Sequence, residues 1–155
     1  MPTLKTNNRN VKEYISGFVD GEGCFSVSFS KRSKFLVGWE TKPSFSVSQN
    51  ADRAEVLFLI QKEFKGGYIR RDFSDKTLKY EVRSLEELIS KVIPHFVKYP
   101  LLSSKQKDFL LFQKVCLLME QGAHKKLPGL KKIAHSAFQM NTSGKRKYSQ
   151  HDMFE

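Results

Sequence analysis

Two segments of the sequence alternate between apolar and polar residues along most of their length. In residues 24–30 (CFSVSFS), phenylalanine and valine alternate with serine, and a similar alternation returns in residues 39–49 (WETKPSFSVSQ). Successive side chains of a β-strand point to opposite faces of a sheet, so a period of two predicts half-buried strands. Any fold of this chain must therefore contain a sheet with one apolar and one polar face. Pro43 indicates that the second strand lies at an edge or contains a bulge.

Other segments have the apolar spacing or the capping signals of helices, and two short ones predict a hairpin. We expect helices at 11–21, 52–64, 84–98, 105–120 and 130–140, and the hairpin at 68–73 and 77–83. Asp52 is the expected N-cap of the second helix, and Ser84 with Glu87 forms the expected capping box of the third. The order αββαββα, followed by further helices, predicts an α+β fold with one antiparallel four-stranded sheet covered by helices on one face.

The length of 155 residues fits one domain, and we expect a single domain over residues 1–155. Residues 1–10 are expected to form a polar N-terminal arm. Residues 141–155 form a basic and polar tail, which either grips DNA or is disordered.

Charge narrows the class of partner. Lys and Arg number 27 against 16 Asp and Glu, which gives a formal net charge of +11. A small domain this basic usually binds an anionic partner, most often nucleic acid and less often a membrane surface. No apolar run approaches the roughly 18 residues that a membrane span requires, so we expect no membrane partner. We also expect no small-molecule substrate.

The two cysteines and the N-terminus bear on the compartment. Cys24 and Cys116 are far apart and have no partners at metal-ligand spacing, which argues for a reducing, intracellular compartment. Residues 1–12 contain no apolar signal segment. We therefore expect synthesis inside an organelle or in a microbial cytoplasm.

The polar face of the predicted sheet is a candidate surface for double-stranded DNA. A curved β-ribbon enters the major groove, where its outward side chains reach base edges. The same face could instead be solvated, and alternation alone does not separate the two interpretations. Arg70 and Arg83 are expected to read guanine, and the serines to read bases adaptably or through water. The phosphate contacts are expected from Lys31, Arg32, Lys34 and the lysines of the tail. The expected DNA contacts are Ser26, Ser28, Ser30, Lys31, Arg32, Lys34, Glu40, Lys42, Ser44, Ser46, Ser48, Tyr68, Arg70, Asp72, Lys79, Glu81, Arg83, Lys145, Arg146 and Lys147.

The segment ISGFVDGEG, residues 15–23, combines a flat helix face with an acidic helix end. Gly17 and Gly21 are four residues apart, so two such helices could approach closely. Glu22 lies at the C-terminal end, where a carboxylate opposes the helix dipole and a cation would offset the cost. If two copies pack around a two-fold axis, their Glu22 carboxylates converge, and hard oxygen ligands suit Mg²⁺. A glycine-capped helix with an exposed acidic end would have the same residues without this function.

This segment resembles the nine-residue signature of the LAGLIDADG homing endonucleases, position by position with conservative changes. Further stretches resemble the family in GCFSVSF, SFSVSQNADR, GGYIRRD and LLSSKQKDF, so the resemblance covers roughly residues 11–115. It implies the αββαββα core of that family, which agrees with the predicted order of elements.

The resemblance also implies roles for individual residues. Glu22 would bind the catalytic metal, and the backbone carbonyl of Gly21 would join the coordination. Gln49 would help to order the catalytic water, Arg53 would lie near the scissile phosphates, and Lys105 would contact the solvent network or stabilise charge. Each of these last three could instead be an ordinary surface residue or a helix N-terminal contact.

The dimer interface implied by the motif helix consists of Ser16, Gly17, Asp20 and Gly21, with Asp20 also expected to help close the helix end. A single motif implies a homodimer, although the chain could be half of a two-motif protein or an engineered derivative.

The implied activity is hydrolysis of both strands of a long, pseudo-palindromic DNA target, leaving short 3′ overhangs. Mg²⁺ is the implied cofactor; Mn²⁺ or Ca²⁺ could occupy the site, with Ca²⁺ not supporting cleavage. The family is common in organellar introns, which points to a chloroplast or mitochondrion.

Three other functions fit part of the sequence. An RNA-splicing maturase on the same scaffold would be equally basic, and a DNA-binding regulator could have lost cleavage. Divalent-metal-dependent cutting separates both from an endonuclease. A basic structural protein of an organellar ribosome would leave the glycine face and Glu22 without a use.

Overall fold

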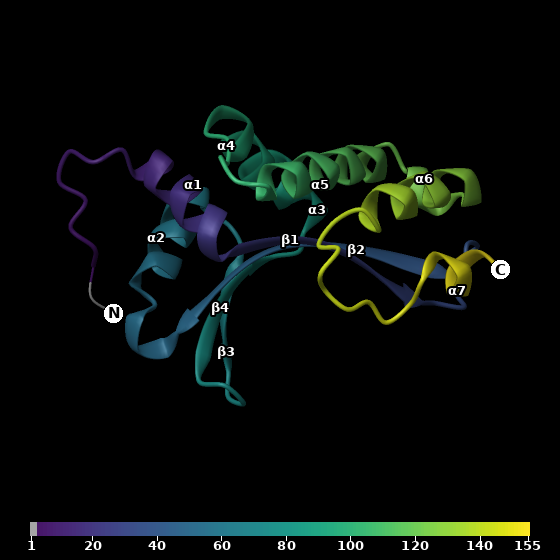
Figure 1. Cartoon of the computed structure of the whole chain (residues 1–155), viewed down its shortest axis with the longest axis horizontal. Helices are drawn as coiled ribbons and strands as arrows, with labels where there is room; N and C mark the ends of the chain where they lie inside the picture. Colours follow the sequence, from purple (N-terminus) through teal and green to yellow (C-terminus); the bar gives the residue numbers. More distant parts are fainter. Residues whose placement is uncertain (1–2) are drawn as a thin grey trace. The chain divides into compact units, whose positions relative to one another are not determined.

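The computed structural model describes residues 3–155, and Figure 1 labels its elements. Helices and strands alternate in the predicted αββαββα order, which confirms the α+β fold class, and further helices follow. The four strands form one sheet in the order β1-β2-β4-β3. The elements are α1 (Val11–Glu22), β1 (Gly23–Lys31), β2 (Trp39–Asn50), η1 (Ala51–Arg53), α2 (Glu55–Phe64), β3 (Tyr68–Asp72), β4 (Thr77–Val82), α3 (Leu85–Glu87), η2 (Leu88–Val92), α4 (Ile93–Lys98), α5 (Lys105–Glu120), η3 (Ala123–Lys125), α6 (Leu127–Ala137) and α7 (Gln150–Phe154).

The chain divides into two compact units, which are described separately. Unit 1 comprises the chain up to Cys24 together with Ser44–Gln106, and unit 2 comprises Phe25–Pro43 together with Lys107–Glu155. Strands β1 and β2 each pass from one unit into the other. The single domain expected over residues 1–155 stays a prediction, and residues 1–2 of the expected arm lie outside the described residues.

An aromatic cluster fills the core of unit 1. Phe45 of β2 lies 5.6 Å from Phe96 and 6.0 Å from Phe64, measured between ring centroids, and Tyr80 of β4 closes the cluster at 6.3 Å from Phe45. All four rings are buried. These residues come from the apolar positions of the alternating strands and from helices α2 and α4, so the period of two correctly predicted the inward face of the sheet.

The opposite face of the sheet in unit 1 is polar because the strand register aligns polar residues in rows. Ser46 pairs with Glu81, which pairs with Tyr68, and all three project from the same side. The next row contains Ser48, Lys79 and Arg70. Antiparallel neighbours in register place their side chains on one face, so three strands present a continuous polar surface.

In unit 2, helices α5 and α6 cover the apolar side of β1. Phe25 lies 5.3 Å from both Phe109 and Phe112 of α5, and Phe29 stacks on Phe138 at 6.0 Å. The serines between these phenylalanines are partly or fully exposed. Strand β1 is therefore half-buried, as its alternation predicts.

The start of the second helix differs from the prediction. A 3₁₀ turn, η1, occupies residues 51–53, and α2 begins at Glu55 with no side-chain cap. Asp52 lies three residues before the first helical residue, too far to accept from the first turn, and pairs with Arg53 at 3.7 Å instead. The expected N-cap at Asp52 is wrong for this reason.

The predicted helix at 84–98 is interrupted. Ser84 accepts from the backbone N–H of Glu87, as predicted, but the Glu87 carboxylate accepts from Gly67 N at 2.6 Å rather than completing the capping box. Residues 88–92 form a π-helical turn just before Pro94. Proline has no N–H and its ring collides with the carbonyl four residues earlier, so the helix widens there.

Strand β2 and helix α6 also differ from the prediction. Strand β2 is an interior strand and not an edge. Its pairing with β4 begins at Phe45, so Pro43 lies beyond that pairing and removes no hydrogen bond to β4. Helix α6 begins at Leu127, with Pro128 in its first turn, three residues before the predicted start.

Within residues 3–155, no helix has both the length and the apolar character needed to cross a bilayer.

The C-terminal tail is folded in unit 2. Ser149 and Asp152 form a capping box that starts α7, and Met153 of this helix is buried. Tyr148 packs against Trp39 with ring centroids 4.9 Å apart. The disordered alternative for residues 141–155 is therefore wrong.

Candidate active site

The acidic end of α1 lies beside the end of β2 in unit 1. Glu22 is the last residue of α1 and is exposed. The Nε2 atom of Gln49 lies 3.4 Å from Glu22 Oε2 and also donates to the carbonyl oxygen of Ser48 at 2.8 Å. The fold thus places two of the predicted catalytic residues next to each other, although 27 positions separate them in the sequence.

Lys105 supplies positive charge at the same helix end. Its Nζ atom donates to the backbone carbonyls of Gly23 at 2.6 Å and Val19 at 3.1 Å. The last carbonyls of a helix have no partners within it, and a cation there stabilises the helix dipole. Lys105 is the cation that the acidic end of α1 requires. An ammonium group has three N–H donors, so one remains for solvent or a phosphate oxygen.

Asp20 fixes the segment that carries Lys105. Its carboxylate accepts from the backbone N–H groups of Leu102 at 2.9 Å and Ser103 at 3.0 Å, and from the Ser103 hydroxyl. Burial raises the pKa of the Asp20 carboxyl, but the hydrogen bonds from Ser103 and Leu102 and the charge of Lys105 together lower this pKa below its usual value. The ionised carboxylate ties α1 to the start of α5.

The glycine face of α1 is open in the part of the chain that the structure describes. A Cβ atom added at Gly17 or Gly21 would meet no atom within 4 Å, and both positions are exposed. Ser16 does not belong to this face, which corrects the sequence prediction. Its hydroxyl is buried, donates to Tyr99 O at 2.6 Å and lies 3.1 Å from His95 Nε2. One residue turns the helix by about 100°, which carries Ser16 to the inward side beside Ile15.

His95 is one of the groups that hold α1. Burial, and secondarily the charge of Lys12, lower the pKa of His95 to about 4. The ring is therefore neutral at physiological pH and bonds Ser16 without bringing charge into the core.

The structure does not bring Arg53 into contact with Glu22. The Arg53 side chain is 71% exposed, and its ion pair within residues 3–155 is with the neighbouring Asp52. A role near phosphates stays a prediction for this residue.

A metal at Glu22 would have few ligands from one subunit. No group of three or more His, Cys, Asp or Glu side chains in residues 3–155 is placed to share a metal ion. The Glu22 carboxylate and the backbone carbonyl of Gly21 are hard oxygen donors, which suit Mg²⁺ or Ca²⁺. The residues therefore fit part of such a site, and other ligands would have to come from outside the subunit.

Glu81 organises the polar face of the sheet in unit 1. We expected its side chain to be an exposed DNA contact, but Glu81 is only 3% exposed. Its carboxylate accepts from Ser44 at 3.1 Å and Tyr68 at 3.0 Å, and pairs with Arg70 and Arg83 at 3.4 Å each. The strand register places it between neighbours that cover it, so the expected contact at Glu81 is wrong.

The neighbours of Glu81 are the exposed part of this face. The Arg70 side chain is 42% exposed and that of Arg83 is 64% exposed. Burial raises the pKa of the Glu81 carboxyl, but the Tyr68 hydrogen bond, Arg83 and Ser44 lower it overall. Glu81 therefore stays ionised and holds two arginine side chains in place on the polar face.

The other predicted contacts in unit 1 lie on the strands or in the β3–β4 turn. Ser46 and Lys79 are half-buried and Ser48 is exposed. Asp72 accepts from the backbone N–H and hydroxyl of Ser74 at 3.0 and 2.6 Å, so its carboxylate is engaged in the turn.

In unit 2, the predicted contacts on β1, β2 and the intervening turn are accessible in part or in full. Arg32 pairs with Glu40 at 2.8 Å and remains 52% exposed. The other accessible members are Ser26, Ser28, Ser30, Lys31, Lys34 and Lys42.

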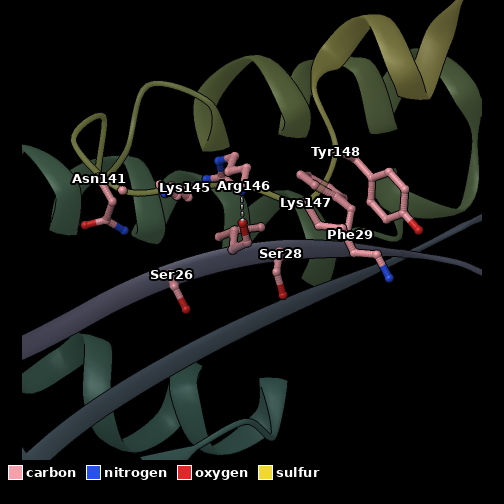
Figure 2. Close-up of a pocket in the computed structure, with 10 residues that line it drawn as sticks. Ser26, Ser28, Phe29, Asn141, Lys145, Arg146, Lys147 and Tyr148 are labelled. Atoms are coloured by element: carbon pink, nitrogen blue, oxygen red, sulfur yellow. Dashed lines mark hydrogen bonds between the residues drawn. The ribbon is translucent and has the colours of Figure 1, made fainter.

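Arg146 in the tail is the clearest departure from the predicted DNA contacts. Its guanidinium donates to the carbonyls of Val27 and Ala137, both at 2.6 Å, and lies over the Phe138 ring at 4.7 Å. Figure 2 shows Arg146 directed toward β1, whereas Ser26 and Ser28 point away from the tail. Strand β1 is an edge of the sheet, so its outer carbonyls need donors, and Arg146 provides one. The expected DNA contact at Arg146 is wrong; Lys145 and Lys147 on either side are exposed.

Asn141 performs a related task that sequence reasoning missed. Its side-chain amide donates to Phe25 O at 2.7 Å, and its backbone has a positive φ of 49° just after α6. Asn141 lies four residues after the end of α6 at Ala137, in a turn, and asparagine is one of the few residues that readily adopt a left-handed conformation there.

Comparisons with known proteins agree with this geometry. The family model described as LAGLIDADG endonuclease matches residues 15–116. "Probable intron-encoded endonuclease 2" of Neurospora crassa is 33% identical over 129 residues, which cover 83% of this chain and 28% of that protein. The chain spans 24–28% of the length of the first three curated relatives it matches.

Solved structures give the same result. The homing endonuclease I-TnaI superposes with a TM-score of 0.81 and 34% identity, covering 92% of both chains. I-LtrWI, a LAGLIDADG homing endonuclease bound to target DNA, has a TM-score of 0.84 and 36% identity over 91% of this chain and 46% of its own. I-SmaMI, bound to uncleaved DNA with calcium ions, has a TM-score of 0.82 and 27% identity over 91% of this chain and 49% of its own. On its matched residues, motif and fold, the chain belongs to the LAGLIDADG endonuclease family.

Proposed function

We propose that this chain acts in a site-specific DNA endonuclease that hydrolyses both strands of a long, pseudo-palindromic target and leaves short 3′ overhangs. The observation that carries the proposal is the placement of Glu22 beside Gln49, at a helix end held by Lys105. The DNA-bound I-LtrWI structure, with its similar fold, supports DNA as the substrate.

We assign Mg²⁺ as the cofactor, held by the Glu22 carboxylate and the Gly21 carbonyl. When bound, the ion would neutralise phosphate charge and lower the pKa of a water molecule. The calcium ions present with I-SmaMI support a divalent site of this kind. Mn²⁺ or Ca²⁺ would also fit the oxygen ligands, and we expect Ca²⁺ to bind without supporting cleavage.

The residues around Glu22 have separate tasks in this proposal. Gln49 holds one Glu22 oxygen through its amide N–H, and its own carbonyl oxygen can accept from a water molecule. The third N–H of Lys105 can donate to a phosphate oxygen or to ordered solvent. No side-chain nucleophile is required, because water attacks phosphorus.

The second Glu22 carboxylate would come from a second copy of the chain. Gly17 and Gly21 leave room for another helix, since no residue from 3 to 155 fills the space beside them. A homodimer would also supply a second polar sheet face and so read a two-fold related target. The 46% coverage of the I-LtrWI chain is equally consistent with half of a two-motif protein.

The experiment is to incubate the purified chain with a large DNA library, in Mg²⁺ or in excess EDTA, and to sequence the cut ends. We expect cuts only with Mg²⁺, at one long near-palindrome with staggered ends. Cutting that is equal in EDTA would overturn the metal assignment. Specific binding of intact library members in Mg²⁺, without any cut, would identify a DNA-binding protein instead.

A further inference from the structure

Positive charge is concentrated in unit 2. Its residues include 13 Lys and Arg against 5 Asp and Glu, a net charge of +8 out of the +11 of the whole chain. The sheet face of this unit accounts for only part of that charge. The rest lies on the tail and on the helices, and the proposed function gives the lysines of the helices no task.

The helices hold a basic groove. The outer sides of α5 and α6 form an open depression, which we name the helix groove, lined by Lys114, Leu118, Lys131, Lys132 and His135. Its lining contains three ammonium groups and an imidazole but no carboxylate. None of these lysines takes part in a salt bridge within residues 3–155.

The lysines of the helix groove make only weak contacts with other side chains in residues 3–155. Lys131 Nζ lies 5.8 Å from the centroid of the Phe154 ring in α7, a cation–π contact at the protein surface. Lys114 and Lys132 are exposed to solvent. Like charges brought together on a surface repel one another and produce a field that attracts polyanions.

The α5 side of the helix groove is turned away from β1, because Lys114 lies two residues after Phe112 and so about 200° around the helix from it. The inward sides of α5 and of the chain after α6 pack on β1 through Phe109, Phe112 and Phe138. Figure 1 shows α5 and α6 on one side of β1. Ser26 and Ser28 project from the other side of the strand, away from these helices. Unit 2 therefore has a polar face on β1 and, on the helices that lie on the other side of this strand, a basic groove.

We propose that the helix groove binds the sugar-phosphate backbone of a second DNA duplex while the sheet face holds the first, so that one protein molecule bridges two duplexes. This inference rests on the proposed function for the sheet face. Bridging would let the protein pass from one DNA segment to another during its search for a single target.

The chemistry of the groove favours duplex backbone over other nucleic-acid ligands. Lysine is a point charge on a flexible stem that meets phosphates without reading bases, and the groove has no arginine to make bidentate base contacts. Its lining also has no Phe, Tyr or Trp ring, and the single imidazole of His135 is a small platform for the successive unstacked bases of a single strand. Sequence-independent contact with a duplex is what remains.

The test measures capture of a second duplex. A biotinylated duplex on beads is saturated with the full chain, and a fluorescent duplex of unrelated sequence is added at several salt concentrations. The groove variant is Lys131→Glu with Lys132→Glu. Its control is Lys62→Glu with Lys98→Glu, the same charge change on exposed lysines of unit 1. A circular-dichroism melt of each variant verifies folding, and Lys131→Gln with Lys132→Gln tests the effect without charge reversal.

We expect the groove variant to lose about tenfold or more of the captured second duplex, and the salt slope of capture to fall by roughly 1 to 2, as for the loss of one or two phosphate contacts. The control should keep most of its capture. Equal capture by the groove variant and the wild type, or an equal loss in the control, would overturn the proposal. Groove-dependent capture of an RNA hairpin, with no capture of duplex DNA, would overturn it in favour of RNA.

Failure of the proposed function gives a different pattern. In that case the wild type would neither cut nor specifically bind any library member, but it would still bind one labelled duplex through Lys131 and Lys132. This result would overturn the proposed DNA site on the sheet face and keep DNA binding by the helix groove. Loss of the groove contact alone would leave specific cutting unchanged.

Discussion

Lys105 donates a hydrogen bond of 2.6 Å to the carbonyl oxygen of Gly23, although 82 positions separate them in the sequence. The bond brings a cation to the end of α1, where Glu22 adds a negative charge to the negative end of the helix dipole. The pair couples the stability of unit 1 to its proposed chemistry.

Lys105→Met should therefore affect both properties. We expect the free energy of unfolding to fall by about 1 kcal/mol, because the carbonyls of Gly23 and Val19 lose the Lys105 ammonium as a donor. We expect cleavage to slow by at least tenfold. Urea titrations and single-turnover cleavage measure the two effects. Lys107→Met, two positions further along α5 and exposed, is the control and should change neither. Wild-type behaviour of Lys105→Met in both assays would mean that this lysine is an ordinary surface residue.

Gly17→Leu tests the proposed interface. The subunit has space beside Gly17, so the variant should fold, and the added side chain should obstruct a second α1 helix. Light scattering should give the mass of a dimer for the wild type and of a monomer for the variant. A leucine introduced at an exposed position of α2, in Lys62→Leu, should leave the mass unchanged. A dimer that persists in Gly17→Leu would show that the interface lies elsewhere.

Asp20→Asn should change the pH dependence of stability. A carboxyl whose pKa is lowered by folding stabilises the protein above its unfolded pKa of about 3.9, and this contribution disappears as the pH falls through the lower folded pKa. Asp20→Asn should consequently melt below the wild type at pH 7, and the difference should shrink as the pH falls from about 5 toward 2. Thermal melts along this series measure it. A difference that stays constant with pH would contradict an ionised Asp20.

Arg146 and Lys147 are neighbours with opposite expected effects. Arg146→Ala removes the guanidinium donor from the carbonyl of Val27 and one of the two donors from that of Ala137, which keeps the backbone N–H of Met140. It should lower the free energy of unfolding by about 1 to 3 kcal/mol. Lys147→Ala should leave stability unchanged and reduce the salt slope of DNA binding by about 1. Urea titrations and binding at several salt concentrations compare the two. If Arg146→Ala alone lowered the salt slope, the side chain would leave β1 to meet DNA.

The sequence predicted the strands well because their signal is local. The apolar positions around Phe25, Phe45 and Tyr80 define which face of the sheet is buried, and a period of two is independent of the rest of the fold. Helix α5 was predicted at its observed limits for a similar reason, with serines before it and Gly122 after it.

Long-range partners could not be predicted from local patterns. Nothing in the sequence near Arg146 indicates that the edge of β1 lies beside it, so a basic run suggested a phosphate contact. Glu81 has the strand position of an exposed residue and is buried by side chains from β2 and β3. Ser16 lies one position from the glycine face, and its bond to Tyr99 depends on helix packing 83 residues away.

The most direct test of the account is cleavage by Glu22→Gln on the target that the library identifies. Glu13→Gln, an exposed glutamate at the other end of α1, is the matched control. We expect Glu22→Gln to lose at least a thousandfold in single-turnover cleavage in Mg²⁺, within the range expected when a group essential to the reaction is removed. Its affinity for the target, measured in Ca²⁺, should be unchanged. The control should cut at the wild-type rate. Mg²⁺-dependent cutting by Glu22→Gln at a rate close to that of Glu13→Gln would contradict the assignment of Glu22 as the metal ligand.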